Sequence, residues 1–277
     1  MPLLHALVLG IAQGLTEFLP VSSTAHLELI PWFFGWDDFG DDAALENAFD
    51  VALHLGTTVG VVAYLWGDVV HYTAESVLAP LRGRGLSRDG RIGWFLLLSA
   101  VPAAVIALAL EDVLLDLAEE IWLIGVMLIV LGLVLAVADR LAGPRVLTEF
   151  GWRDALLMGG GQALALIPGV SRSGGSMTAG RLIGFERESV ARIAFLMSIP
   201  IIAGAAVVRG LQVLAGDGIP GELVGGFVVG VAASALTGWF AVWFMLRWLR
   251  TRSFVPFVIY RCALGGLVLV LLATGVR

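Results

Sequence analysis

The fold is decided by the stretch Gln13-Gly-Leu-Thr-Glu-Phe-Leu-Pro-Val-Ser-Ser-Thr-Ala-His26, near the start of the chain. It lies in an apolar segment, yet it carries Glu17, two adjacent serines and His26. A carboxylate within membrane-type sequence is costly unless it faces a polar cavity or a partner. Pro20 also interrupts any helix that enters the stretch. The stretch therefore predicts a broken helix that carries a polar site.

The composition indicates a polytopic membrane protein. The chain has 277 residues, of which 58% are hydrophobic and 14% charged, and its mean hydropathy is +0.92. An ordinary soluble domain is about a quarter charged. All 17 basic residues are arginines, so a P-loop or a Schiff-base lysine is excluded. The single cysteine excludes a disulfide within the chain, and the N-terminus lacks the basic start of a signal peptide.

Six apolar runs are long enough to cross a bilayer, which takes about 20 residues. Two further segments, 3–34 and 153–185, are apolar but are broken in the middle by proline and small polar residues. Non-helical backbone persists at membrane depth only when it is buried in protein or lines a wet cavity. We therefore predict an all-α polytopic membrane protein with six transmembrane helices and two re-entrant helix-loop-helix hairpins. The six runs lie near 47–66, 94–110, 121–138, 191–209, 223–246 and 254–275.

A weak internal repeat relates the two broken segments. At a spacing of 149 residues, Gln13 matches Gln162 and Ser22 matches Ser171. Three spans follow each hairpin, so the second copy is inverted relative to the first, and the two loops can meet near the midplane. We predict a single integral membrane domain, 1–277, with repeat one at 1–141 and repeat two at 150–277.

Arginines mark one side of this arrangement. Segments 67–93, 139–153, 181–192 and 247–253 carry most of them, whereas the opposite segments 37–46, 111–120 and 217–222 are acidic. Arg209 and Arg277 are the exceptions. The positive-inside rule then puts both termini outside. We expect a multi-pass protein of the plasma (inner) membrane with its active site facing outside.

The first loop carries residue types that suit phosphate chemistry. Gln13 and Glu17 are four apart and share one face of the first half-helix. Ser22 or Ser23 suits the N-cap of the next half-helix, whose free N–H groups form an anion site. His26 lies about one turn further and can lean over the same site. The alternative is a purely structural role. The serines would then be helix caps, and His26 and Glu17 would form a buried pair that stabilises the hairpin.

The second loop adds a cation. Arg172 lies among serines and glycines, and a guanidinium, hydroxyls and open backbone are the groups that bind phosphate oxygens. If the loops meet, Arg172 faces Glu17. A buried ion pair alone would not need the flanking serines and glycines, which favours an anion site. The serines are Ser171, Ser173 and Ser176.

Three further polar residues lie inside the predicted spans. For Arg261, in the last span, three arrangements are possible. We expect it to pair with Asp50 or Glu17, to reach the phosphate, or to snorkel to the interface. Asp50 and His54, one turn apart in the first span, either support the site from behind or lie at the interface.

These motifs resemble a known family. The stretch from Gln13 to His26 and Pro168-Gly-Val-Ser-Arg-Ser-Gly-Gly175 look like the two signature motifs of bacterial undecaprenyl-diphosphate phosphatases, the bacitracin-resistance family (BacA/UppP type). Phe254-Val-Pro-Phe-Val-Ile-Tyr-Arg261 resembles that family's last-span motif. The resemblance covers essentially the whole chain. The first position of the Glu/Gln-x-x-x-Glu pattern is glutamine here, which leaves one carboxylate.

The resemblance implies hydrolysis of undecaprenyl diphosphate to the monophosphate, which recycles the lipid carrier of cell-wall synthesis and confers bacitracin resistance. Glu17 would help hold a divalent cation, magnesium or calcium. Ser23 would be the nucleophile and His26 its acid/base partner, although the sequence leaves open whether Ser23 or an activated water attacks. Arg172 would act on the diphosphate. The substrate-binding residues would be Gln13, Ser22, Ser171, Ser173, Ser176 and Arg261.

A transporter or flippase of polyprenyl phosphate is the alternative, because inverted repeats with broken helices are transporter architecture. A carrier needs the anion site but not the nucleophile and base. The type 2 phosphatidic acid phosphatases are excluded, since their signature needs a lysine, and a histidine beyond Arg172, that this chain lacks. The expected partners are the polyprenyl diphosphate and the bilayer, with no nucleic acid. Gly225-Gly226 and Gly265-Gly266 can serve contacts within one chain or in a homodimer.

Overall fold

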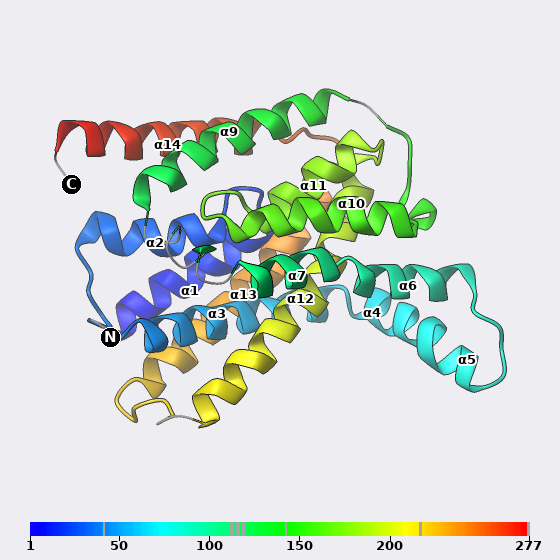
Figure 1. Cartoon of the computed structure of the whole chain (residues 1–277), viewed down its shortest axis with the longest axis horizontal. Coiled ribbons are helices and arrows are strands. Elements are labelled where there is room, and N and C mark those ends of the chain that lie inside the picture. The colour runs from blue at the N-terminus through cyan, green and yellow to red at the C-terminus, as the bar shows by residue number, and fades with distance from the viewer. Residues whose placement is uncertain are drawn as a thin grey trace.

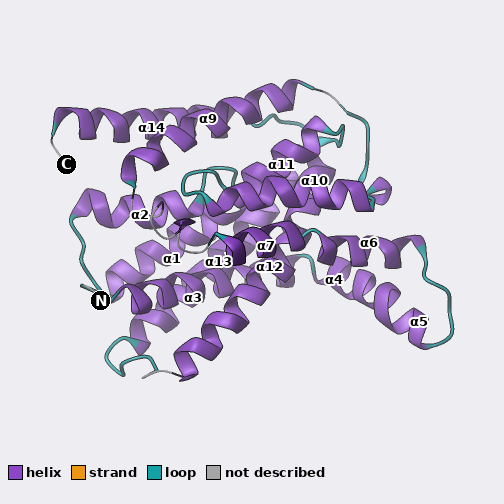
Figure 2. Cartoon of the chain, in the orientation of Figure 1, coloured by secondary structure: helices purple, strands orange, loops and turns teal. Residues whose placement is uncertain are grey.

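The computed structural model describes residues 1–40, 42–110, 113–114, 117, 120–141, 143–215 and 218–275. Every regular element of more than one residue within this part of the chain is a helix (Figures 1 and 2). Several residues of the predicted charge asymmetry lie outside the described residues. They are Asp41, Glu111, Asp112, Asp116, Glu119, Asp217 and Arg277, and the side chain of Arg209 is not described either.

Five helical segments are long and apolar enough to cross a membrane, and a bent pair raises the number to six. The bent pair consists of α3 (Ala43–Tyr64) and the helical stretch Trp66–Leu81, at 82° to each other. This agrees with the six predicted spans. The five are α6 and α7 together (Arg88–Leu98 and Val101–Ala109), α9 (Ile121–Arg140), the first part of α12 (Arg187–Ala215), α13 (Val224–Leu249) and α14 (Val255–Thr274).

Two predicted spans differ in detail from the structure. The run 47–66 does not end in a loop, because the chain continues after the bend as α4 (Trp66–Thr73), the π-helix η1 (Ala74–Leu78) and α5 (Ala79–Leu81). The run 94–110 is interrupted between α6 and α7, where Pro102 lies in the first turn of α7. Proline has no N–H for the preceding turn, so it suits a helix start and breaks a continuing helix.

The two broken segments form helix-loop-helix hairpins. The first hairpin pairs α1 (Leu3–Phe18) with α2 (Ser23–Phe34), and the second pairs α10 (Trp152–Ala163) and η3 (Leu164–Leu166) with α11 (Arg172–Leu182). The two arms of each hairpin pack together (Figure 1). None of these helices reaches the length of about 20 residues that a full crossing takes.

The packing follows the inverted repeat. α1 packs on α13, and its counterpart α10 packs on α6 and α7. The third spans α9 and α14 contact each other, as do the first spans α3 and α12. Gly265 allows α14 to approach α9 closely within the chain, since a Cβ there would lie 2.5 Å from the Gly125 carbonyl. Gly266 has open space around it. The repeat limits 1–141 and 150–277 stay a prediction.

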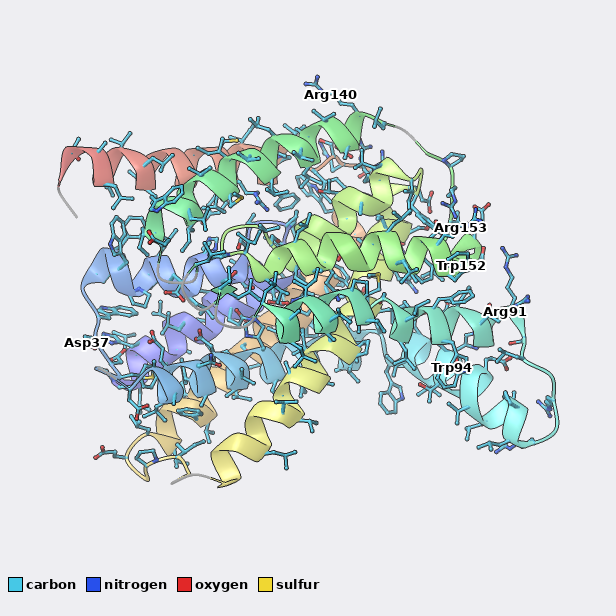
Figure 3. The ribbon with its side chains drawn as sticks, viewed as in Figure 1. Asp37, Arg91, Trp94, Arg140, Trp152 and Arg153 are labelled. Carbon is cyan, nitrogen blue, oxygen red and sulfur yellow. The ribbon has the colours of Figure 1, made fainter. Side chains whose placement is uncertain are left out.

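The charged ends lie opposite each other. Arg91 and Arg153 lie at the end of the molecule far from Asp37 (Figure 3). The N-terminus and the described end of the C-terminal helix α14 lie at the same end as Asp37 (Figure 1). Trp94 and Trp152 are half exposed beside the arginines, as interfacial tryptophans are. The short 3₁₀ turn η2 (Leu147–Glu149) completes this end.

Candidate active site

The first hairpin turns at Ser22, which has a φ of 74°. Non-glycine residues rarely adopt this left-handed conformation, and it clusters at functional sites. α1 ends at Phe18, directly before Leu19 and Pro20, and α2 begins at Ser23. The Ser22 side chain accepts a hydrogen bond from the Ala25 N–H, so it is the N-cap of α2. Ser22 therefore acts as a buried cap in this structure.

The second hairpin repeats this geometry. Ser171 has a φ of 77° and caps α11 by accepting a hydrogen bond from the Gly174 N–H. Ser22 and Ser171 are the only non-glycine residues with positive φ in the described chain. They are also the pair that the sequence repeat aligned. The repeat therefore extends to the backbone conformation of the two loops.

The two loops contact each other, as predicted. Ser173 Oγ in the second loop donates to the Leu19 carbonyl in the first at 3.1 Å. Arg172 Nε lies 3.8 Å from Glu17 Oε1, so the cation does face the carboxylate. The Arg172 guanidinium makes no hydrogen bond within the described residues, and its side chain is 26% exposed. It therefore retains donors for an anion.

Arg261 lies between the two loops and does not have the carboxylate partner that was one of the expectations. It is fully buried, and its three nitrogens all donate to backbone carbonyls. It contacts neither Asp50 nor Glu17, does not snorkel, and has no nitrogen free for phosphate. Arg261 is thus a clamp that joins both loops to α9, and its predicted role in substrate binding stays a prediction. The carbonyls belong to Pro20 in the first loop, Gly169 and Val170 in the second, and Met127 and Leu128 in α9.

Glu17 is the centre of the site. Its side chain is 2% exposed, and its Oε2 accepts from Ser23 Oγ at 2.6 Å and from Gln13 Nε2 at 3.1 Å. His54 Nε2 lies 3.5 Å from the same oxygen. A carboxylate that accepts a short hydrogen bond from a serine orients the hydroxyl and is the nearest acceptor for its proton.

His26 has other partners than the predicted one. Its Nδ1 lies 2.7 Å from the Ser22 carbonyl and its Nε2 lies 2.7 Å from the Tyr260 hydroxyl. A carbonyl only accepts, so Nδ1 carries the proton and Nε2 accepts from Tyr260. In this structure, therefore, Ser23 is hydrogen-bonded to Glu17 and not to His26. The acid/base role of His26 stays a prediction that requires its ring to leave Tyr260.

The remaining serines of the second loop are buried and already bonded. Ser171 Oγ caps α11, and Ser176 Oγ donates to the Arg172 carbonyl at 2.9 Å. The predicted roles of these serines, and of Gln13 and Ser22, in substrate binding stay predictions. The structure adds Tyr260, for which the sequence had suggested no role. Its position next to Arg261 in the last-span motif was the available signal.

A divalent cation fits the atoms around Glu17. Gln13 Oε1 and His54 Nε2 are buried and have no hydrogen-bond partner. Both belong to residues that contact Glu17, so the three side chains can offer electron pairs to a cation. Glu17 and His54 are only two potential ligands, and the described residues contain no cluster of three or more His, Cys, Asp or Glu side chains that could hold a metal ion. Any cation there would draw on an amide, a hydroxyl and phosphate oxygens, which Mg²⁺ commonly uses.

Comparison with known proteins extends these observations to the whole chain. Residues 6–267 match the family model described as bacitracin resistance protein BacA. An undecaprenyl-diphosphatase of Nocardioides sp. is 45% identical over 275 residues, which cover 99% of this chain and 97% of that protein. An undecaprenyl-diphosphatase of Desulforudis audaxviator is 47% identical over 268 residues, or 96% of this chain and 97% of that protein. The family match covers both loops and leaves out only the first residues of α1 and the last turns of α14.

Proposed function

This chain belongs to the bacitracin resistance protein BacA family, and we propose that it hydrolyses undecaprenyl diphosphate to undecaprenyl phosphate and inorganic phosphate. One observation carries the proposal. Where the two loops meet, a serine hydroxyl lies 2.6 Å from a buried carboxylate, and an arginine with free donors lies 3.8 Å from the other oxygen of that carboxylate. A nucleophile, an acceptor for its proton and an anion-binding group are thus held together. The reaction recycles a lipid carrier of the cell wall.

The chemistry is a displacement at the terminal phosphorus. The attacking oxygen is that of Ser23 or of a water beside it. It forms a bond to phosphorus while the bond to the bridging oxygen breaks and undecaprenyl phosphate leaves. Glu17 takes the proton of the attacking group, and Arg172 binds the charge on the phosphoryl oxygens. If Ser23 attacks, water then cleaves the phosphoserine, and a trapped phosphoenzyme would distinguish this route from direct attack by water.

His26 is the second proton-transfer group of this proposal. Its Nε2 accepts a hydrogen bond from Tyr260, so a proton can pass between the two side chains. Bound diphosphate would draw the ring from Tyr260 toward Ser23. The side chains therefore act at different points of the reaction, because Glu17 takes the proton of the attacking group whereas His26 with Tyr260 carries out a later proton transfer.

We further propose that a divalent cation, magnesium or calcium, is held by Glu17 with Gln13 beside it. The unpartnered oxygen of Gln13 supports this, because a buried carbonyl without a partner is rare. When bound, the cation supplies charge that offsets the diphosphate. Arg172 alone carries one positive charge, whereas a diphosphate carries at least two negative ones.

The lipid tail constrains how the substrate arrives. Each buried CH₂ contributes about 0.8 kcal/mol, so a polyprenyl chain stays in the bilayer while its headgroup enters the site. We propose that the protein lies in the plasma membrane, with the Asp37 end outside and the site open to that face. The opposite clustering of Arg91 and Arg153 supports this orientation through the positive-inside rule.

The test is phosphate release from undecaprenyl diphosphate by the purified protein in detergent, with and without EDTA. We expect release that EDTA abolishes and added Mg²⁺ or Ca²⁺ restores. The inverted repeat suits a flippase as well, and that function predicts lipid movement across vesicles without phosphate release. No release under any metal condition, from protein that remains folded, would overturn the hydrolase.

A further inference from the structure

The clearest unused group in the site is the imidazole of His54. It lies on α3, its side chain is 12% exposed, and its Nε2 is 3.5 Å from Glu17 Oε2 without a hydrogen-bond partner. That separation is too long for a good N–H···O hydrogen bond. Gln13 Oε1 is also buried and unpartnered. Two orphaned acceptors beside one carboxylate are unusual, because buried polar atoms are nearly always paired.

The tautomer of His54 follows from its other nitrogen. Nδ1 lies 2.8 Å from the Asp50 carbonyl, which only accepts hydrogen bonds, so Nδ1 carries the proton. Nε2 therefore either carries a second proton, which makes an ion pair with Glu17, or points its lone pair at the carboxylate oxygen. In the second case a divalent cation bound by both atoms stabilises the pair, and the 3.5 Å separation is short enough for one ion to contact both. Metal-binding histidines commonly donate their other N–H to a backbone carbonyl in this way, which fixes the ring.

The backbone around His54 is held firmly against α13. Ser234 Oγ on α13 donates to the Leu53 carbonyl at 2.6 Å. Gly56 approaches the same helix so closely that a Cβ there would lie 2.6 Å from the Val231 carbonyl. The His54 carbonyl also accepts from the hydroxyls of Thr57 and Thr58. His54 is therefore held at a fixed position, as a ligand must be.

We infer that His54 Nε2 is a direct ligand of the divalent cation held by Glu17. The Gln13 amide faces Glu17 with its nitrogen, and turning it over would bring Oε1 to the same position as a neutral oxygen ligand. This inference rests on the cation of the proposed function. An imidazole ligand suits transition-metal ions better than Mg²⁺ or Ca²⁺, and Mn²⁺ is the transition-metal ion that also suits carboxylate and carbonyl oxygens. The chain should therefore bind Mn²⁺ more tightly than Mg²⁺, although glutamine replaces the second carboxylate.

The test uses Mn²⁺ as the probe on the purified full chain, without substrate. Pulsed electron paramagnetic resonance detects nitrogen bound to Mn²⁺ directly, and titration gives its affinity. We expect a nitrogen signal from the wild-type protein, and in His54→Gln loss of that signal with at least a tenfold weaker affinity. His26→Gln should retain the signal. His71→Gln, at an exposed histidine paired with Asp89, is the matched control and should equal wild type.

The melting temperature without metal shows whether His54→Gln is folded, and His54→Asn gives a second folded variant if it is not. Absence of a nitrogen signal in the wild type, or its survival without His54, would overturn the inference. Phosphate release is measured separately on the wild type. Release without a nitrogen signal refutes the ligand but leaves the hydrolase, whereas a His54-dependent signal without release refutes the hydrolase but leaves the ligand.

Discussion

Replacing Arg261 by methionine is expected to separate the two loops of the site. The guanidinium makes six hydrogen bonds to five backbone carbonyls. Three of these carbonyls, at Pro20, Gly169 and Val170, accept no other hydrogen bond among the described residues. Methionine has a similar length but no donor, so these three buried carbonyls would be left unpaired.

The structure gives the size of the effect. A buried polar group that loses its partner costs about 1–3 kcal/mol, so three carbonyls cost about 3–9 kcal/mol. Whole domains are stable by about 5–15 kcal/mol. A loss of about 3 kcal/mol would lower the melting temperature of a chain this long by roughly 6 °C or more. Lysine at the same position keeps three donors and should give an intermediate effect.

The assay is thermal unfolding in detergent. A thiol-reactive dye reports exposure of Cys262, the single cysteine, and tryptophan fluorescence gives a readout that does not depend on the neighbouring thiol. Arg247→Met, at an exposed arginine on α13, is the matched control and should unfold like wild type. Wild-type melting and full hydrolysis by Arg261→Met would refute the clamp.

Three further predictions concern the site and the topology. Glu17→Gln should lower hydrolysis by more than tenfold, about 1.4 kcal/mol of barrier, while the protein still folds, and retention of more than a tenth of the activity would remove Glu17 from the essential groups. Tyr260→Phe removes the hydroxyl bonded to His26, and we expect it to shift the pH dependence of kcat while KM changes little. An unchanged pH dependence of kcat would contradict a proton path through this pair. In a cysteine-free background, Leu86→Cys should be labelled only from the cytoplasm and Asp37→Cys only from outside, and the reverse pattern would invert the topology.

The sequence predicted the parts of the fold that membrane burial dictates. Proline and serine inside an apolar segment require a broken helix, and broken backbone at that depth requires a protein neighbour. The two loops therefore had to meet, and Ser173 does contact Leu19. The bend after Tyr64 was not predicted, because the apolar pattern continues through it and nothing in the composition marks an angle of 82°.

The partners of the site residues were harder to predict than their identity. Arg261 pairs with backbone carbonyls, and every residue has a carbonyl, so its partners leave no mark in the sequence. His26 was expected to face Ser23, but its Nε2 is hydrogen-bonded to the Tyr260 hydroxyl instead. His54 reaches Glu17 because α3 packs beside α1, and this depends on tertiary contacts between helices.

The repeat explains why one loop carries the nucleophile and the other the cation. Ser23 and Arg172 are each the first residue of a helix, directly after the two serines with positive φ. The same backbone position therefore presents a hydroxyl in the first copy and a guanidinium in the second. Because the copies are inverted, these two side chains approach the centre from opposite directions.

The asymmetry extends one turn back along each hairpin. Glu17 in the first copy aligns with Leu166 in the second, so only one copy has a carboxylate to activate the hydroxyl. Gln13 bonds to Glu17, whereas its counterpart Gln162 is buried with neither side-chain polar atom paired. An unpaired amide costs free energy and is retained only where something offsets that cost.

A symmetric pair of anion-binding loops would suit a carrier. The single carboxylate beside Ser23 makes one loop reactive, and this favours chemistry over transport.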